Sequence, residues 1–401
     1  MLAYIGPNGK TNGNGAVLEA SLQRAATLVQ DPPRNGRAET VEDFNRFLGP
    51  LQPLLADPAV SDILVNGFDT VYIEKAGRLE LTSVRFRDDA ELLDVIEKIA
   101  AKTGRQVDTT RPLVDMRLPD GSRVNAAVPP VSIDGPALSI RRFGRNPLLA
   151  EDLVSKLAMT EHMLKFLKAC VAARLNIVIS GGTGSGKTTL LNALSRFIPD
   201  HERVVTIEDA AELRLQRRHV VRLESRPADL DGQGSVPIRQ LLVNALRMRP
   251  DRIIVGEVRS SEALDMLQAM NTGHDGSLTT VHANTPRDTL SRLEVMAGMG
   301  DSNLTTKVIR AQMSSALDLI VQASRLTDGT RRITHITEVL GMEGEVVTTQ
   351  DVFVFDKTGM TPEGKVRGRF RATGIRPKAC EKLAVQGFVF DSSSFEMRQE
   401  V

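Results

Sequence analysis

The stretch LNIVISGGTGSGKTTLLNALSRFI, residues 175–198, decides the fold of this chain. Residues 177–179 are apolar and β-branched, which is typical of a strand buried on both faces. The loop 181–188 matches the pattern GxxxxGK[ST], and the helix predicted after it carries apolar residues along one face until Pro199 ends it. A strand, a glycine-rich loop and a helix in this order predict a phosphate-binding loop (P-loop) inside an α/β domain.

The residue types of this loop indicate its chemistry. Glycines let the backbone approach an anion closely, and the loop N–H groups and the helix N-terminus favour negative charge there. Lys187 can reach the β- and γ-phosphates of a nucleotide, and the Thr188 hydroxyl can bind Mg²⁺. A chance match arises in roughly 1–2% of chains of this length. We therefore expect a nucleoside triphosphate to bind at Gly181, Gly182, Thr183, Gly184, Ser185, Gly186, Lys187, Thr188 and Thr189.

The composition narrows the class of protein. Lys and Arg number 51 against 50 Asp and Glu, which argues against a dedicated nucleic-acid binder. The two cysteines, Cys170 and Cys380, are isolated, so they predict neither a zinc cluster nor a disulfide framework and suit a reducing cytoplasm. No apolar run approaches the ~20 residues that span a bilayer. We expect any membrane contact to be peripheral and made through a partner.

The chain divides into four predicted parts. Residues 1–35 read as a disordered or partly helical tail, although 6–11, GPNGKT, contain a fragment of the P-loop pattern. Residues 36–143 alternate short strands with one helix and predict an α+β domain. A linker follows at 144–156. Residues 157–401 alternate helices with strands, which predicts a parallel sheet. Its expected strands are 175–180, 203–208, 219–223, 252–256 and 277–282, with paired strands in 333–356.

Acidic residues end two of these predicted strands. Glu208 and Asp209 follow one buried strand, and Glu257 follows another. Ligands of open α/β sheets bind beyond the carboxyl ends of strands, so these acids can orient water or hold Mg²⁺. Glu257 has the position of a Walker B acid and, with Thr188, is the predicted metal ligand. The alternatives are helix-capping or solvated carboxylates. Which glutamate acts as the general base stays open at this point.

Histidines and arginines form two further groups of candidates. His274 and His282 flank one strand, and their spacing does not fit a helical zinc pair, which leaves a phosphate-sensing, interface or structural role. Four arginines gather on the late strands of the first domain, where arginine forks suit phosphate. From spacing alone, solvated strand-face arginines remain the simpler interpretation. The four are Arg117, Arg123, Arg141 and Arg142.

With these blocks in view, residues 60–400 resemble the secretion traffic ATPases of type II and type IV secretion and of type IV pili, and most closely the CpaF family of Tad (Flp) pilus assembly ATPases. GGTGSGKTT resembles the Walker A motif of that family, and VVTIEDAAEL resembles its Asp box. ALRMRPDRIIVGEVRSSEALDMLQAMNTGHDGSLTTVHANTPRDTLSRLE resembles its Walker B motif and His box run together. RLPDGSRVN and GPALSIRRF resemble the end of its N-terminal domain, and ITHITEVLGMEGEVVTTQDVFVF its C-terminal region.

The resemblance implies an N-terminal α+β domain followed by a RecA-like P-loop NTPase domain. It also implies a homo-hexameric ATP hydrolase that uses ATP and Mg²⁺. Hydrolysis would move the domains and power pilus assembly or protein export at the cytoplasmic face of the inner membrane, with inner-membrane platform proteins as partners and no direct nucleic acid.

The same resemblance implies roles for single residues. Lys187, Glu208, Glu257, His282 and His274 fall on the catalytic boxes. Arg123 and Arg141 match the N-terminal arginines that contact phosphate, and Arg217 or Arg218 could reach the phosphate of a neighbouring subunit. Two departures stand out, because a four-cysteine zinc element is missing here and the N-terminal tail is short for some members.

Three other functions stay open. The ATPase of a type IV secretion system would share these catalytic boxes. A nucleic-acid translocase on a RecA core predicts a basic stripe and salt-sensitive DNA binding, against which the balanced charge counts. An ATP-gated switch with little turnover predicts that Glu208→Gln has no effect.

Overall fold

The computed structural model describes residues 46–75, 77–142, 148–228, 232–301 and 303–401. The predicted tail lies outside these residues, as does the start of the predicted linker. The chain divides into two compact units, Met1–Ile73 with Leu81–Arg141, and Glu74–Glu80 with Arg142–Val401.

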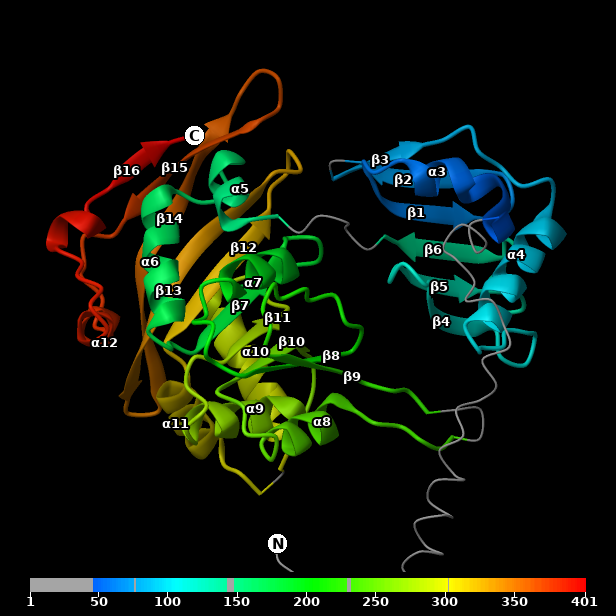
Figure 1. Cartoon of the computed structure of the whole chain (residues 1–401). Helices are drawn as coiled ribbons and strands as arrows, with labels where there is room; N and C mark the ends of the chain where they lie inside the picture. Colours follow the sequence, from blue (N-terminus) through cyan, green and yellow to red (C-terminus); the bar gives the residue numbers. More distant parts are fainter. Residues whose placement is uncertain (1–45, 76, 143–147, 229–231, 302) are drawn as a thin grey trace, which may run out of the picture. The chain divides into compact units, whose positions relative to one another are not determined.

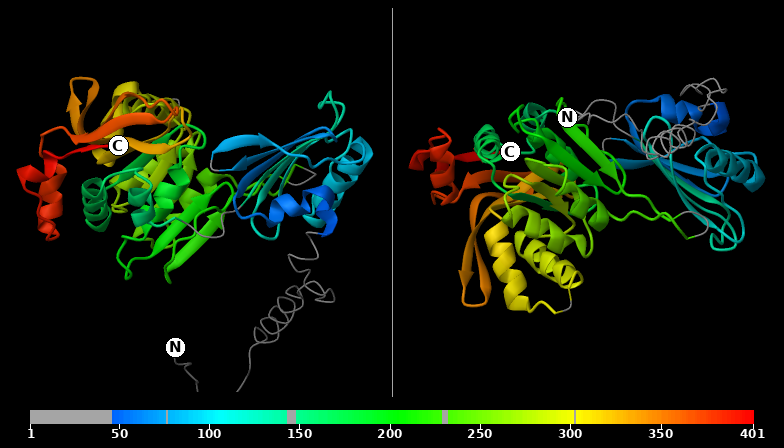
Figure 2. Two further views of the ribbon diagram at one scale, coloured as in Figure 1. Left: turned by 90° about the horizontal axis from the view of Figure 1, so that it is seen from above. Right: turned by 60° about the horizontal axis from the view of Figure 1, so that its bottom comes forward.

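Apart from residues 74–80 of the β2–β3 hairpin, which the division above assigns to the second unit, the first unit is a six-stranded sheet with helices on one face (Figures 1 and 2), in the strand order β3-β2-β1-β6-β5-β4. Its helix α4 begins because the Asp88 side chain accepts a hydrogen bond from the Glu91 N–H at 2.8 Å. Ile96 and Ile99 then point into the core against β1 and β5 residues such as Ile63. The elements are η1 (Arg46–Leu51), α3 (Gln52–Ala56), β1 (Val60–Asn66), β2 (Thr70–Lys75), β3 (Arg78–Leu81), α4 (Asp89–Lys102), β4 (Leu113–Arg117), β5 (Arg123–Ala127) and β6 (Ala137–Arg141).

The second unit is built on a ten-stranded sheet in the order β16-β15-β14-β13-β12-β7-β11-β10-β8-β9. The six strands from β12 to β9 run parallel, and β13 to β16 are added as antiparallel strands. The strands are β7 (Ile177–Gly181), β8 (Val204–Glu208), β9 (Val220–Glu224), β10 (Arg252–Val258), β11 (Leu278–Val281), β12 (Leu319–Arg325), β13 (Arg331–Glu343), β14 (Val346–Met360), β15 (Val366–Ala372) and β16 (Arg398–Glu400).

Helices cover both faces of the parallel part of this sheet. Ile177 and Ile179 of β7 pack into one core with α6 and α7, whereas Val178 packs into the other core with α8 to α11. Every residue of β7 is buried, as its apolar sequence predicts. The helices are α5 (Ala150–Ser155), α6 (Glu161–Ala172), α7 (Lys187–Ser195), α8 (Ile238–Ala245), α9 (Glu262–Asn271), α10 (Pro286–Gly298), α11 (Thr306–Ala316), α12 (Ala379–Val385) and η2 (Ser392–Phe395).

Two parts of the second unit differ from the sequence-based expectation. We missed β12, which lies between β7 and β13 in the sheet. Residues 150–155, which we assigned to the linker, form helix α5, because Ala150 and Leu153 are buried in the α6–α7 core. Within the described residues, every helix is too short or too polar to cross a lipid bilayer.

Candidate functional site

The carboxyl ends of β7, β8, β10 and β11 meet at one edge of the large sheet, because these strands are parallel neighbours. This edge carries the P-loop after β7, Glu208 at the end of β8, Glu257 near the end of β10 and His282 after β11. The P-loop and three further predicted site residues, drawn from distant parts of the sequence, are thus brought to one place. We call this place the P-loop edge.

The P-loop itself takes the strained turns that its glycines predict. Gly184 and Gly186 have φ values of +67° and +94°, a region that glycine adopts without steric cost. The Lys187 ammonium group donates to the carbonyl oxygens of Gly181 and Gly182, both at 3.0 Å, so it is held over the loop. Gly181 packs tightly, because a Cβ atom there would lie 2.3 Å from the Ala323 carbonyl oxygen.

The remaining loop residues lie at the start of α7. Lys187, Thr188 and Thr189 are the first three residues of this helix, and all three are half-buried. The N–H groups of a first helical turn have no partner inside the helix, and they favour an anion. The Ser185 hydroxyl donates to the Gly182 carbonyl at 2.9 Å and fixes the loop from within. The cradle therefore fits a nucleotide phosphate, with the Thr188 hydroxyl available to a metal ion.

Glu208 is the most unusual titratable group of the P-loop edge. Only 3% of the residue is exposed. Its Oε1 atom accepts hydrogen bonds from the backbone N–H groups of Glu212 and Leu213, both at 2.9 Å, whereas the buried Oε2 atom has no partner. Burial raises the pKa of this carboxyl to about 7, against the opposing effect of the two N–H donors. Gly256 of β10 makes room for it, because a Cβ there would lie 2.8 Å from the Glu208 Cγ atom.

Glu257 and Asp209 share one cation. The Arg259 guanidinium contacts the Glu257 carboxylate through Nε at 3.0 Å and Nη2 at 2.6 Å, and it contacts the Asp209 carboxylate through Nη1 at 3.0 Å. Such charge-assisted pairs fix the positions of both carboxylates. Sequence reasoning missed Arg259, although it stands two residues after Glu257 in the block that carried the resemblance.

His282 lies within the electrostatic reach of the same groups. Partial burial and the positive charge of Lys187 lower its pKa, and the carboxylate of Glu257 opposes this shift. The segment that carries His282 is anchored by β12, because the Gln322 amide donates to the carbonyls of Ala283 at 3.2 Å and Asn284 at 3.0 Å. Gln322 is a second residue that sequence reasoning missed.

Within one chain, His274 is not brought to the P-loop edge. It precedes β11, whereas His282 follows this strand, so the two histidines lie at opposite edges of the sheet. The His274 Nδ1 atom lies 3.2 Å from the Ala269 carbonyl oxygen, and its own carbonyl accepts from the Ser277 hydroxyl at 2.7 Å. These contacts stabilise the turn between α9 and β11 that contains His274.

Arg217 and Arg218 precede β9 and also lie at the amino edge of the sheet. The Arg217 guanidinium donates to the carbonyl oxygens of Ile198 and Pro199, and only 3% of its side chain is exposed. The Nη atoms of Arg217 are thus held against the segment after α7, whereas its buried Nε atom has no partner, and its reach to the phosphate of a neighbouring subunit stays a prediction. Arg218 is exposed.

The arginines of the first unit form a row across its sheet. In the strand registers, Asp62 stands opposite Arg141, Arg141 opposite Arg123, and Arg123 opposite Arg117. The Arg141 Nε atom lies 3.3 Å from an Asp62 carboxylate oxygen. The row faces away from the buried residues of the same strands, such as Val124. Like charges on adjacent strands repel, so a row of this kind favours an anion.

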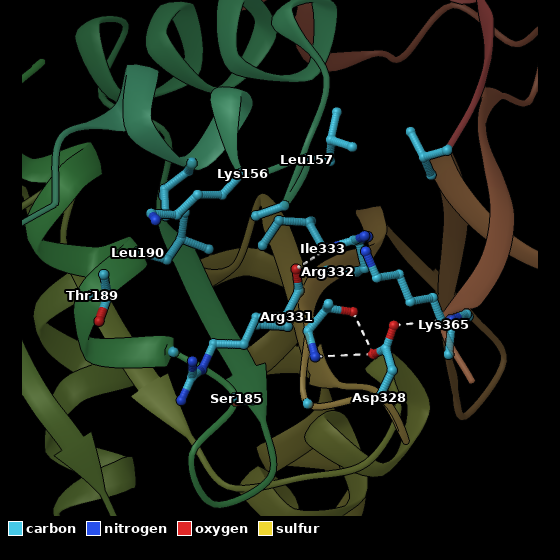
Figure 3. Close-up of a pocket in the computed structure, with 18 of the residues that line it drawn as sticks. Lys156, Leu157, Ser185, Thr189, Leu190, Asp328, Arg331, Arg332, Ile333 and Lys365 are labelled. Atoms are coloured by element: carbon cyan, nitrogen blue, oxygen red, sulfur yellow. Dashed lines mark hydrogen bonds between the residues drawn. The ribbon is translucent and has the colours of Figure 1, made fainter. Parts of the chain in front are cut away.

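A pocket of the second unit opens beside the P-loop and α7 (Figure 3). Figure 3 shows Thr189 and Leu190 at one side of it and Lys365 at the other, with Arg331 and Ile333 of β13 between them. The Arg331 Nε atom donates to the Gly184 carbonyl at 2.8 Å and so joins the pocket to the loop. Its walls include Leu148, Leu153, Lys156, Leu157, Ala158, Ser185, Gly186, Thr189, Leu190, Ala323, Asp328, Gly329, Thr330, Arg331, Arg332, Ile333, Thr358, Thr361, Lys365, Val366, Arg367, Glu400 and Val401.

Comparisons with known proteins agree with this architecture. The model of the family described as type II/IV secretion system protein matches residues 46–384. The chain is 37% identical over 306 residues to a Mycobacterium tuberculosis protein named as a putative conjugal transfer protein, and the match spans 74% of this chain and 86% of the relative. It is 37% identical over 295 residues to the conjugal transfer protein TrbB of Rhizobium radiobacter, which spans 72% of this chain and 86% of the relative. It is 32% identical over 340 residues to the type IV secretion system protein VirB11 of Bartonella quintana, and this match spans 74% of this chain and 93% of the relative.

Two solved structures share the fold. The Legionella pneumophila ATPase DotB is 23% identical with a TM-score of 0.51, covering 75% of this chain and 81% of that chain. The pilus retraction motor PilT, solved with bound ADP, is 20% identical with a TM-score of 0.51, and the match covers 77% of this chain and 84% of that chain. The chain thus belongs to the type II/IV secretion system ATPase family. The predicted order of an N-terminal domain and a P-loop ATPase domain is confirmed.

Proposed function

We propose that this chain hydrolyses ATP with Mg²⁺ at the P-loop edge. The observation that carries the proposal is the meeting of Lys187, the buried Glu208 and the Glu257 carboxylate at the carboxyl ends of neighbouring parallel strands. P-loop hydrolysis needs a phosphate cradle, a metal ligand and a residue that positions water, and each has a candidate here. Loop N–H groups and Lys187 would hold the phosphates.

The structure favours Glu208 over Glu257 as the general base. A base works best when its pKa lies near the working pH, and burial brings the pKa of Glu208 to about 7. Its buried Oε2 atom has no hydrogen-bond partner, so this oxygen would accept from a water molecule that enters the site with the nucleotide. The Glu257 carboxylate is instead held by Arg259, which suits a group that orients the water shell of Mg²⁺ beside the Thr188 hydroxyl. His282, close to both charges, would sense the γ-phosphate.

The nucleoside of the bound ATP would enter the pocket on its α7 side. Gly186, Thr189 and Leu190 line that side directly after the P-loop. The row that contains Arg123 and Arg141 would supply positive charge to the phosphates during the cycle. In a ring of subunits this charge could come from the same chain or from its neighbour.

At the level of the cell, we propose a homo-hexameric motor at the cytoplasmic face of the inner membrane, bound to platform proteins of a secretion or pilus machine. The likeness to VirB11 and TrbB supports the ATPase of a type IV secretion system. The C-terminal strands β13 and β14 carry the resemblance to the CpaF family and support Tad pilus assembly. Deletion of the gene, scored for surface pili and for conjugal transfer, separates the two roles.

The first test is the steady-state ATPase rate against protein concentration, with particle mass followed by light scattering. We expect the rate per chain to rise as hexamers assemble. Lys187→Ala and Glu208→Gln should lower it by about 100-fold or more while they leave assembly unchanged. His282→Ala should also lower the rate, and His274→Ala is its matched control at the other edge of the sheet. A constant rate on a monomer, or a rate that appears only with DNA, would overturn the motor assignment.

A further inference from the structure

Arg332 is a buried cation whose guanidinium has no acidic hydrogen-bond partner among the described residues. It is the second residue of β13, it lines the pocket, and only 7% of it is exposed. Its Nη1 atom donates to the Arg331 carbonyl at 3.1 Å, whereas its buried Nε atom has no partner. Burial lowers the pKa of the guanidinium, although the charge of Asp328 opposes this. A buried guanidinium with several unused donors is costly, and its retention calls for an acceptor.

The wall of the pocket around Arg332 is basic. We call residues 328–367 on this side the basic wall. Lys365 and Arg367 line it and are exposed, and Lys156 faces the same pocket from the segment after α5. Among the described residues, the charged groups of these three side chains form no hydrogen bond and no salt bridge. Several cations around one hollow create a positive potential that attracts an anion, although the Glu363 carboxylate lies close enough to Lys365 to interact with its charge.

Three acidic residues also line the pocket, Glu80, Asp328 and Glu400, and none of them is hydrogen-bonded to the Arg332 guanidinium. The Asp328 carboxylate accepts hydrogen bonds from the backbone N–H groups of Thr330 and Val366, both at 2.9 Å, and from the Thr330 hydroxyl at 2.6 Å. Its oxygens therefore bind the turn between β12 and β13 and the start of β15, and none of them is hydrogen-bonded to the Arg332 guanidinium. Glu400 also lines the pocket, but it is exposed.

The same pocket offers apolar surface. Leu157, Ile333 and Val366 lie on its walls between the cations. Pockets that combine a few charged groups with apolar side chains take small organic ligands with a polar or charged end. Figure 3 shows Arg332 and Lys365 on the side of the pocket away from Thr189, where the P-loop helix begins. The basic wall is thus formed by a segment other than the one that cradles the ATP phosphates.

We propose that the basic wall binds the phosphate group of a second small organic ligand, with Arg332 as its central contact and Lys365 and Arg367 at the rim. A phosphate suits the site because it carries up to two charges and several acceptor oxygens, and a guanidinium fork matches it. Through Arg331, which holds the Gly184 carbonyl, a ligand seated here adjoins the loop that binds ATP.

The test separates this site from the P-loop. The full-length Lys187→Ala protein, with its P-loop contact removed, is titrated with inorganic pyrophosphate and, in parallel, with malonate. Isothermal calorimetry gives the affinity and thermal unfolding gives the shift in Tm. We expect pyrophosphate to bind and to raise the Tm. Adding Arg332→Met should weaken this binding by about tenfold or more, as should the exposed pair Lys365→Met and Arg367→Met.

Arg369→Met is the matched control, because Arg369 lies on the same strand β15 and pairs with Asp356 outside the pocket. It should leave the binding of pyrophosphate unchanged. The proposal is wrong if pyrophosphate does not bind to Lys187→Ala, or if the pocket variants bind it as well as the control does. Equal or tighter binding of malonate would overturn the assignment of phosphate. If Arg332→Met raises the KM for ATP and pyrophosphate does not bind separately, the basic wall is part of the ATP site and the proposal is wrong.

Discussion

Glu208 shows at the scale of one residue how burial prepares a group for chemistry. Burial raises the pKa of its carboxyl from 4.5 to about 7. Between these pH values the folded chain keeps a proton that the unfolded chain has released, so the free energy of unfolding falls as the pH rises through this window. A shift of this size lowers the free energy of unfolding by roughly 3 kcal/mol. Most of this destabilisation is absent at pH 4.5, and it is fully present above pH 7.

We therefore predict that Glu208→Gln stabilises the protein, and more so at high pH. Glutamine is neutral at every pH, so the variant escapes the cost of burying a charge. Its Tm should be close to that of the wild type at pH 5 and clearly higher at pH 8, as measured by thermal unfolding without nucleotide. A difference in Tm that stays the same across this range would show that the carboxyl of Glu208 titrates at its ordinary pKa.

The sequence alone predicts that distant residues lie together only where each of them follows a strand of the parallel sheet. Lys187, Glu208 and Glu257 were expected together because each follows a buried parallel strand, and the structure places them at one edge. His274 was grouped with His282 by motif, but a strand of four residues separates their ends. The contacts of Arg259 and the burial of Arg332 depend on packing between segments far apart in sequence, which periodicity does not reveal.

At the scale of elements, the sequence predicts the parallel strands β7 to β11 but not β12, which is parallel to β7. The predicted strands are apolar, β-branched and bounded by turn residues, as β7 shows. β12 has the sequence LIVQASR and follows the end of α11 at Ala316 after only two residues, without glycine or proline between them. Its polar Gln322 is satisfied by the carbonyls of another loop. Because these long-range hydrogen bonds satisfy a buried glutamine, β12 can be a central strand without the apolar pattern by which such strands are predicted.

The contact of β7 with β12 gives a prediction at this scale. A methyl group on Gly181 would lie 2.3 Å from the Ala323 carbonyl oxygen of β12 and 2.4 Å from the Ser185 hydroxyl, whereas one on Gly182 would meet no atom within 4 Å. Gly181→Ala should therefore push the strands apart and lower the free energy of unfolding by about 1–3 kcal/mol. Gly182→Ala, the adjacent control, should change it by less than about 0.5 kcal/mol. Urea denaturation measures both, and equal losses would contradict the tight contact.

At the scale of the whole molecule, the two units have separate hydrophobic cores. The core of the first unit contains Ile63 and Ile96, and the second unit has its own cores on the two faces of the large sheet. The first unit carries the arginine row and the second carries the P-loop edge. Domains with separate cores can fold and move as units, which the proposed motor requires.

Separate cores predict two thermal transitions, of which nucleotide shifts one. In calorimetry of the full chain, Ile63→Ala should lower only the transition of the first unit, and Leu194→Ala only that of the second, because each buried deletion costs about 2–5 kcal/mol in its own core. Mg²⁺ with ADP at 100 times its Kd should stabilise the transition that Leu194→Ala identifies by about 2.7 kcal/mol, and Lys187→Ala should abolish this shift. A single transition that both deletions lower equally would mean that the two units unfold as one cooperative body. In that case, the domain motion of the proposed motor would need a partner or a neighbouring subunit to release it.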